Sequence, residues 1–198
     1  MARYFTTTLQ SGERVMAPIS SFLWAGCGYG GSCLPKDTKA LSAHGAAHGM
    51  PMPLLDAVIH TNLGQPAKMV ALLERHFASL KDLKVAVLGL AFKEDTDDVR
   101  ESPAIPIVKL LVERGVRVIA YDPIASQAAK PMLPASVRYA ASLEEAVADV
   151  EAALLVTRWD EFKQLPALFS KRLSAPLLID GRRMLARDAV ARYEGVGL

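Results

Sequence analysis

The chain has 198 residues, of which 51% are hydrophobic, and its 23 Lys and Arg against 21 Asp and Glu give a formal net charge of +2. Such a balance leaves no basic excess for neutralising phosphates along a duplex, so we expect no nucleic-acid partner. The two cysteines cannot form a disulfide framework, and no apolar run approaches the roughly 20 residues of a membrane span. The first residues also lack the apolar core of a signal peptide, so we expect a cytoplasmic protein that does not contact a membrane.

The N-terminal part of the chain is predicted to be mainly helical. Ser20–Trp24 could form a short helix, although no longer apolar periodicity supports it. After the glycine-rich segment GCGYGG, Pro35 suits the first position of a helix that we expect to run to about Ala47. A second helical stretch over Pro53–Leu80 carries apolar residues at helical spacing, and Pro66 inside it is expected to kink or divide the helix.

The C-terminal part of the chain alternates strands and helices. Short apolar runs predict strands at Lys84–Leu90, Val116–Tyr121, Ala152–Thr157 and Pro176–Asp180. Helices are predicted at Pro103–Arg114, at Leu143–Ala148 behind a capping box of Ser142 and Glu145, and at Trp159–Ser170, which Pro166 breaks. This alternation predicts a parallel sheet covered on both faces. The expected fold class is α/β, with a mainly helical region over residues 1–82 and a Rossmann-like domain over residues 83–198.

Cys33 lies between the glycine-rich segment and the helix that Pro35 begins. The N–H groups and positive partial charge of a helix N-terminus stabilise a thiolate, and Lys36 adds a positive charge. Asp37 follows about one turn later and could act as a general base through water. The arrangement fits attack of a thiolate on a carbonyl carbon, although a lone cysteine beside glycines is more often a small structural residue. Cys27 has no charged neighbour in the sequence and is predicted to be structural.

Two further segments place cations after predicted strands, where a doubly wound sheet has its ligand crevice. In GLAFKEDTDDVRES, Lys93 and Arg100 could bind an anion such as a diphosphate, and the acidic residues between them are expected to face solvent or pair with Arg100. In DGRR, Arg182 suits phosphate or carboxylate binding. A charged surface turn explains either segment equally well. No predicted strand leads into a GxGxxG segment, so the sequence shows no dinucleotide-binding fingerprint on the sheet.

Three segments together resemble the nucleotide-sugar 6-dehydrogenases, that is, the UDP-glucose/GDP-mannose dehydrogenase family. They are GCGYGGSCLPKDTKAL (26–41), GLAFKEDTDDVRESPA (89–104) and IDGRR (179–183), and the resemblance extends from about Phe22 to Arg183. It implies that a nucleotide sugar is oxidised twice at C6 with NAD, through a cysteine thiohemiacetal and then a thioester. The UDP-glucose enzymes are the nearest type, and GDP-mannose is the alternative substrate.

The resemblance also implies roles for single residues. Cys33 matches the nucleophile, and Asp37 matches the acid that orients or activates water. The residues assigned to the substrate are Tyr29, Gly30, Gly31, Lys93 and Arg182, and those assigned to the cofactor are Lys36 and Arg100. No metal site is implied.

The chain departs from the family pattern in its N-terminal part. The NAD-binding domain of the family has no counterpart, and neither has the stretch with a catalytic lysine and asparagine that precedes the cysteine. The arginine that usually precedes the Phe22-Leu23 pair aligns without gaps to Ala17, with Arg14 as the nearest candidate. We therefore expect the C-terminal half of such an enzyme, inactive alone and dimeric through the helix at 53–80. A chain of a split enzyme with a separate NAD-binding chain, or a non-catalytic UDP-sugar-binding or dimerisation module, are the alternatives.

Overall fold

The computed structural model describes residues 6–8, 14–16 and 26–197. Near the N-terminus, β1 (Thr6–Thr8) and β2 (Arg14–Met16) pair in antiparallel register. Arg14 thus begins β2, whereas the helix predicted at Ser20–Trp24, the Phe22-Leu23 pair and Ala17 lie outside the described residues.

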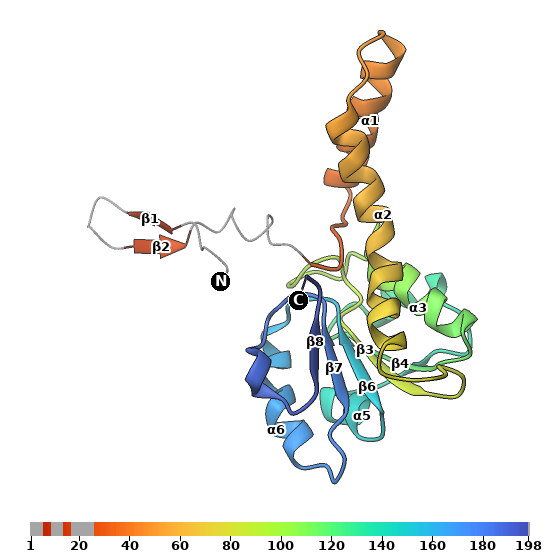
Figure 1. Ribbon diagram of the computed structural model, residues 1–198, viewed down its shortest axis with the longest axis vertical. Coiled ribbons are helices and arrows are strands. Elements are labelled where there is room, and N and C mark those ends of the chain that lie inside the picture. Colours follow the sequence, from red (N-terminus) through yellow and green to blue (C-terminus); the bar gives the residue numbers. More distant parts are fainter. Residues whose placement is uncertain (1–5, 9–13, 17–25, 198) are drawn as a thin grey trace.

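Two helices lie side by side and project away from the rest of the molecule (Figure 1). α1 (Leu34–Ala47) and α2 (Pro53–Glu74) confirm the predicted helices, although α2 ends before Leu80. Of the two outcomes predicted at Pro66, a kink or a division, the division does not occur, because α2 continues through this residue. A proline inside a helix removes one backbone hydrogen bond, and α2 compensates by burying Pro66 and the apolar residues of its last turns, which are Met69, Val70, Leu72 and Leu73.

Within residues 26–197, the strands of the C-terminal part form one six-stranded parallel sheet in the order β5-β4-β3-β6-β7-β8. The predicted strands correspond to β3 (Lys84–Leu88), β4 (Arg117–Tyr121), β6 (Ala152–Leu155) and β7 (Leu177–Asp180). The edge strands β5 (Arg138–Tyr139) and β8 (Tyr193–Gly195) were not predicted, because they are too short and polar to form an apolar run. The strand order is that of the Rossmann fold. The chain adds strands towards one edge from β3 to β5, and then towards the opposite edge from β6 to β8.

Helices cover both faces of the sheet, as predicted. Alternate residues of β3 point to opposite faces: Val85 and Val87 pack with α2 and with α3 (Ala104–Glu113), whereas Ala86 and Leu88 pack towards α5 (Leu143–Val147). Half of the predicted capping box of α5 is present, since the Glu145 N–H donates to Ser142 Oγ at 3.1 Å. The Glu145 carboxylate accepts from the Ala141 N–H at 2.8 Å, where a capping box would have the N–H of Ser142. The predicted break before Pro166 is also present.

The remaining short helices complete the connections. The break near Pro166 separates the 3₁₀ helix η3 (Asp160–Gln164) from α6 (Leu165–Ser170), while α4 (Ser126–Ala129) and η2 (Lys130–Met132) join β4 to β5, and η4 (Arg187–Ala189) precedes β8. None of the helices in the described residues combines the length and hydropathy that crossing a membrane requires.

Candidate functional site

The three segments that carry the resemblance meet at one edge of the sheet. The loop of residues 26–33, which we name the cysteine loop, contacts the other two segments through its backbone. The Cys27 N–H donates to Gly181 O at 2.8 Å, and the Gly31 N–H donates to Arg100 O at 2.9 Å. Because β3 and β7 are parallel neighbours of β6, the turns that follow them lie at the same edge, where the crevice of this fold is found.

The glycines of the cysteine loop allow the backbone to approach other parts of the protein itself. A Cβ at Gly30 would collide with the carbonyl oxygen of Glu101, and one at Gly31, whose φ is +85°, would lie 2.8 Å from the ring of Phe92. The segment has the GxGxxG spacing, but these contacts account for its glycines without a bound pyrophosphate. The close packing fixes the loop against the sheet domain.

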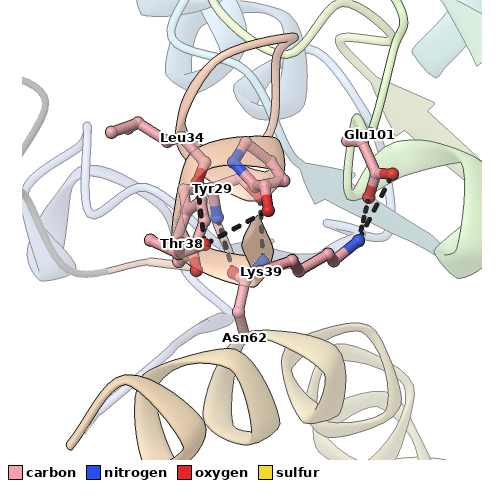
Figure 2. Close-up of polar contacts among 7 residues, drawn as sticks. Tyr29, Leu34, Thr38, Lys39, Asn62 and Glu101 are labelled. Atoms are coloured by element: carbon pink, nitrogen blue, oxygen red, sulfur yellow. Dashed lines mark hydrogen bonds and ion pairs between the residues drawn. The ribbon is translucent and has the colours of Figure 1, made fainter. Parts of the chain in front are cut away.

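Side chains hold the cysteine loop at the peptide between Gly28 and Tyr29. Arg182 donates through Nη1 to Gly28 O at 2.9 Å and through Nε to Val156 O at 2.5 Å. Asn62, on α2, accepts from the Tyr29 N–H at 2.8 Å and donates through Nδ2 to Tyr29 O at 3.0 Å (Figure 2). Sequence analysis did not single out Asn62, because a lone asparagine in a helix gives no signal of a contact with a distant loop.

The two cysteines occupy contrasting environments. Cys33 is the N-cap of α1, its side chain is exposed, and its Sγ lies 3.7 Å from Ser32 Oγ. Cys27 is fully buried, its thiol lies 3.6 Å from Val156 O, and burial raises the pKa of that thiol. Reagents in solution therefore have access to Cys33 and not to Cys27, in agreement with the structural role predicted for Cys27.

The first turn of α1 carries a charged pair beside the exposed thiol. The Asp37 N–H donates to Cys33 O at 2.8 Å, and the Asp37 carboxylate forms an ion pair with Lys36. The side-chain hydrogen bond that Lys36 donates to the Asp37 carboxylate raises the pKa of Lys36, although both side chains are more than 60% exposed. Farther along α1, Lys39 reaches Glu101 at 3.4 Å and links the helix to the loop after β3 (Figure 2).

Arg100 is engaged by its own segment. Its guanidinium donates to the Asp98 carboxylate through Nε at 3.0 Å and through Nη2 at 2.7 Å. These hydrogen bonds hold the pKa of Asp98 below its ordinary value. The predicted pairing of Arg100 with the acidic run is therefore present, with Asp98 as the partner.

A cavity of about 1410 Å³ opens between the sheet edge, the cysteine loop and α2. Its walls include all six residues assigned to the nucleophile and the substrate, namely Cys33, Tyr29, Gly30, Gly31, Lys93 and Arg182. The other assigned residues, Lys36, Asp37 and Arg100, do not line it. Lys93 is exposed, with its Nζ 5.9 Å from the centre of the Phe92 ring. The structure thus divides the assigned residues into those that line the cavity and three charged residues outside its lining, Lys36, Asp37 and Arg100, which we name the rim.

The sheet edge does not fit a dinucleotide, despite the strand order. In dinucleotide-binding sheets, an acidic residue beyond the first turn binds the ribose hydroxyls. Asp122, at the carboxyl end of β4, is buried, and its Oδ2 accepts from the Leu90 and Ala91 N–H groups at 2.7 and 3.1 Å and from the Trp159 indole at 3.1 Å. A Cβ at Gly89 would collide with Thr157. The protein's own groups therefore fill the positions that NAD would need here.

Comparison with family models decides the relationship. The UDP-binding domain of the UDP-glucose/GDP-mannose dehydrogenase family matches residues 86–187, and the central domain of that family matches residues 9–63. The chain belongs to the UDP-glucose/GDP-mannose dehydrogenase family. The resemblance carried by the three segments is thereby confirmed, and the first match covers most of the parallel sheet and its helices, with β8 lying beyond it.

Individual members of the family are similar over most of the chain. UDP-glucose 6-dehydrogenase AglM of Haloferax volcanii is 44% identical over 177 residues, which are 89% of this chain and 40% of AglM. UDP-glucose 6-dehydrogenase TuaD of Bacillus subtilis is 42% identical over 84% of this chain and 36% of TuaD. The chain therefore spans about 40% or less of the length of these two curated relatives.

Solved structures of the family share the fold. A UDP-glucose dehydrogenase from Pyrobaculum islandicum superposes with a TM-score of 0.77 and 38% identity, covering 86% of this chain and 38% of that one. A GDP-mannose dehydrogenase from Pseudomonas aeruginosa gives 0.74 and 26%, covering 89% and 41%. The α/β fold class is thereby confirmed. The boundary near residue 82 stays a prediction, and α2 approaches it with its last turns buried in the sheet domain.

Proposed function

We propose that the chain supplies the nucleotide-sugar site and the cysteine nucleophile of an NAD-dependent nucleotide-sugar 6-dehydrogenase, with UDP-glucose as the substrate. The observation that carries the proposal is the position of Cys33, which is exposed at the N-terminus of α1 and lines the same cavity as Lys93 and Arg182. A cysteine nucleophile and two cations on one wall suit a ligand with a reactive carbonyl at one end and a diphosphate in its middle.

The cations differ in their freedom to bind a diphosphate. Lys93 is exposed and extends over Phe92 without an ion-pair partner among the described residues. Arg182 donates to two backbone carbonyls, so its remaining N–H groups would meet the ligand from a fixed position. We assign Lys93 to charge neutralisation and Arg182 to orientation, with Tyr29, Gly30 and Gly31 forming the adjoining wall.

The covalent chemistry assigned to this chain begins at Cys33. Its thiolate adds to the C6 aldehyde carbon, a C–S bond forms, and the carbonyl electron pair moves to oxygen, which takes a proton to give a thiohemiacetal. Conversion of the thiohemiacetal to the thioester releases a hydride, for which NAD would be the acceptor, and the hydroxyl proton. Water then attacks the acyl carbon, the C–S bond breaks, and the thiolate and the carboxylate of the product are released. Asp37 is proposed to take the proton of that water, because it lies one turn beyond Cys33.

NAD, which the family uses as hydride acceptor, does not fit the sheet edge described above, so no step through it is assigned to these residues. We propose that it binds outside the described residues, on another part of the protein or on a separate chain. Lys36 and Arg100 are proposed to face it from the rim. Each would then exchange its carboxylate partner, Asp37 or Asp98, for an anion of the cofactor.

The projecting helices are proposed to pair two copies of the chain. Several large apolar side chains of α1, α2 and their connection are exposed, namely Leu41, Met50, Leu54, Val58 and Leu63. Leu54 and Val58 also line the cavity, so a second copy seated on this surface would lie close to the site. Apolar surface of this extent on a helix pair is typical of a protein–protein interface.

The proposed function is tested by alkylation of the two cysteines with iodoacetamide at neutral pH, followed by peptide mass spectrometry. We expect Cys33 to react at least about 100-fold faster than buried Cys27, and UDP-glucose to slow the reaction at Cys33. GDP-mannose is the matched competitor, and Lys93→Ala should weaken the protection by UDP-glucose. If neither nucleotide sugar protects Cys33, the proposed substrate site is wrong.

A non-catalytic binding module and a split enzyme give different results in the same system. If the chain is a non-catalytic binding module, it should bind UDP-glucose. Addition of a family NAD-binding domain should then start no NADH formation, whether or not Cys33 is alkylated. For a split enzyme, mixing with that domain would start NADH formation, and Cys33→Ser would abolish it.

A further inference from the structure

We infer that Asn62 is a positioning residue, which clamps the cysteine loop to α2 and thereby sets where Cys33 stands in the cavity. The clamp is visible in Figure 2, where the side chain of Asn62 reaches from α2 to the backbone of Tyr29. Both hydrogen-bonding groups of the Asn62 amide are used on the same residue, at 2.8 Å and 3.0 Å. A primary amide is suited to this, because it donates and accepts side by side.

The geometry leaves little room for another arrangement of the loop at this point. Gly28 has a φ of +114°, and a Cβ there would lie 3.0 Å from Asn62 Oδ1. On the other side, Arg182 binds the Gly28 carbonyl. The peptide between Gly28 and Tyr29 is therefore held by a side chain from α2 and by a side chain from the turn after β7.

The helix that carries Asn62 can transmit this position from the sheet domain. The last turns of α2 are buried in the core, with Met69 and Leu73 fully inaccessible, whereas its first half projects from the domain (Figure 1). Asn62 is half-buried and lies between these two parts. A helix anchored in the core thus holds one end of the loop that leads to Cys33, the N-cap of α1.

The helical conformation of α2 does not itself favour an asparagine at position 62. Asparagine is a poorer helix former than alanine or leucine, because its side chain competes with the backbone for hydrogen bonds. Replacing Asn62 with leucine, which has nearly the same shape, should therefore favour α2 locally. A loss of order in the cysteine loop after this replacement would consequently report the clamp and not the helix.

The test is hydrogen exchange of backbone amides, followed by NMR, in the full chain and in Asn62→Leu. The Tyr29 N–H donates to Asn62, whereas the Gly31 N–H donates to Arg100 O and has no bond to Asn62. If Asn62 positions the loop, both amides should exchange about tenfold faster in the variant. Amides of β3 serve as the internal reference for global stability and should not change.

The result that overturns the inference is faster exchange at Tyr29 alone, because Asn62 would then satisfy one bond in a loop that is held elsewhere. Unchanged exchange at both amides overturns it as well. Asn62→Asp keeps the acceptor for the Tyr29 N–H but sets a carboxylate oxygen against the Tyr29 carbonyl oxygen, so it should restore only part of the protection at Gly31. Should Asn62→Leu fail to fold, Asn62→Ala takes its place against the same criteria. His60→Leu, at an exposed position on the same helix, is the control for added apolar surface.

The role of the clamp for Cys33 rests on the proposed function and has its own readout. In Asn62→Leu, protection of Cys33 from iodoacetamide should require at least about fivefold more UDP-glucose, and Asn62→Asp should recover part of that loss. Absence of protection in the unaltered chain would contradict the proposed function only, since the exchange rates at Tyr29 and Gly31 decide the clamp without any ligand.

Discussion

The sheet domain and the helix pair α1–α2 differ in how their apolar residues are used. In the sheet, β3, β6 and β7 are buried almost throughout, and cores on both faces take up their side chains. In the helix pair, only the last turns of α2 reach a core, and large apolar side chains elsewhere remain exposed. The sheet therefore buries its apolar side chains within the described chain, whereas the helix pair presents apolar surface that suits a partner.

The sharpest test of this comparison is truncation of one apolar side chain in each region. Phe162 is fully buried under the sheet, so Phe162→Ala should lower the free energy of unfolding by about 3–5 kcal/mol. Leu41 on α1 is 50% exposed, so Leu41→Ala should change it by less than about 0.5 kcal/mol. Urea titrations at concentrations too low for self-association measure both, and comparable losses would break the distinction.

A smaller effect is expected when charge is placed on the projecting surface. Leu63 is 66% exposed on α2, so Leu63→Glu should leave the isolated chain folded but weaken dimerisation at least about tenfold, because a carboxylate would be desolvated at the interface. Analytical ultracentrifugation measures the dissociation constant. Leu173→Glu changes a fully exposed leucine outside the helix pair and is the matched control. Equal dissociation constants for the two variants would refute the proposed dimer surface.

The smallest effect should come from the ion pair on the rim. Because Arg100 holds the pKa of Asp98 below its ordinary value of 3.8, the folded state favours the ionised carboxylate. This contribution to stability is complete above pH 3.8 and is lost as the pH falls through the lowered pKa of the folded state. Asp98→Asn should therefore destabilise the chain slightly at neutral pH, and the difference should disappear in acid. Thermal melts between pH 2 and pH 7 would show it, and a difference that grows in acid would contradict this assignment.

Much of the fold followed from local patterns in the sequence. The four apolar runs form the central strands, and Ser142 caps α5 as predicted, because burial and capping are set by neighbouring residues. The edge strands were missed, since their pairing comes from tertiary contact with β4 and β7. Pro66 was judged by its local cost alone, whereas the burial of α2 outweighs that cost.

Sequence patterns predicted only part of the candidate site. The three segments that resemble the family contain Cys33, Lys93 and Arg182, which the structure brings to one cavity. These segments could not show that Arg182 also braces the cysteine loop, nor that Asn62 clamps it, because those contacts join residues far apart in the chain. Adjacent charges in the sequence did indicate the pair of Arg100 with Asp98, since both lie in one turn.

The buried carboxylate of Asp122 has a consequence for protein engineering. A Rossmann sheet invites conversion into a nicotinamide-binding module by grafting a glycine-rich turn after its first strand. Here such a graft would fail alone, because the carboxylate that should receive the ribose already orders the turns after β3 and β4 and anchors the Trp159 indole. A redesign would have to replace three features together: the hydrogen bonds of Asp122 to the turns, its bond with the Trp159 indole, and the packing of Thr157 against Gly89. Contacts within the protein itself therefore oppose dinucleotide binding at this sheet.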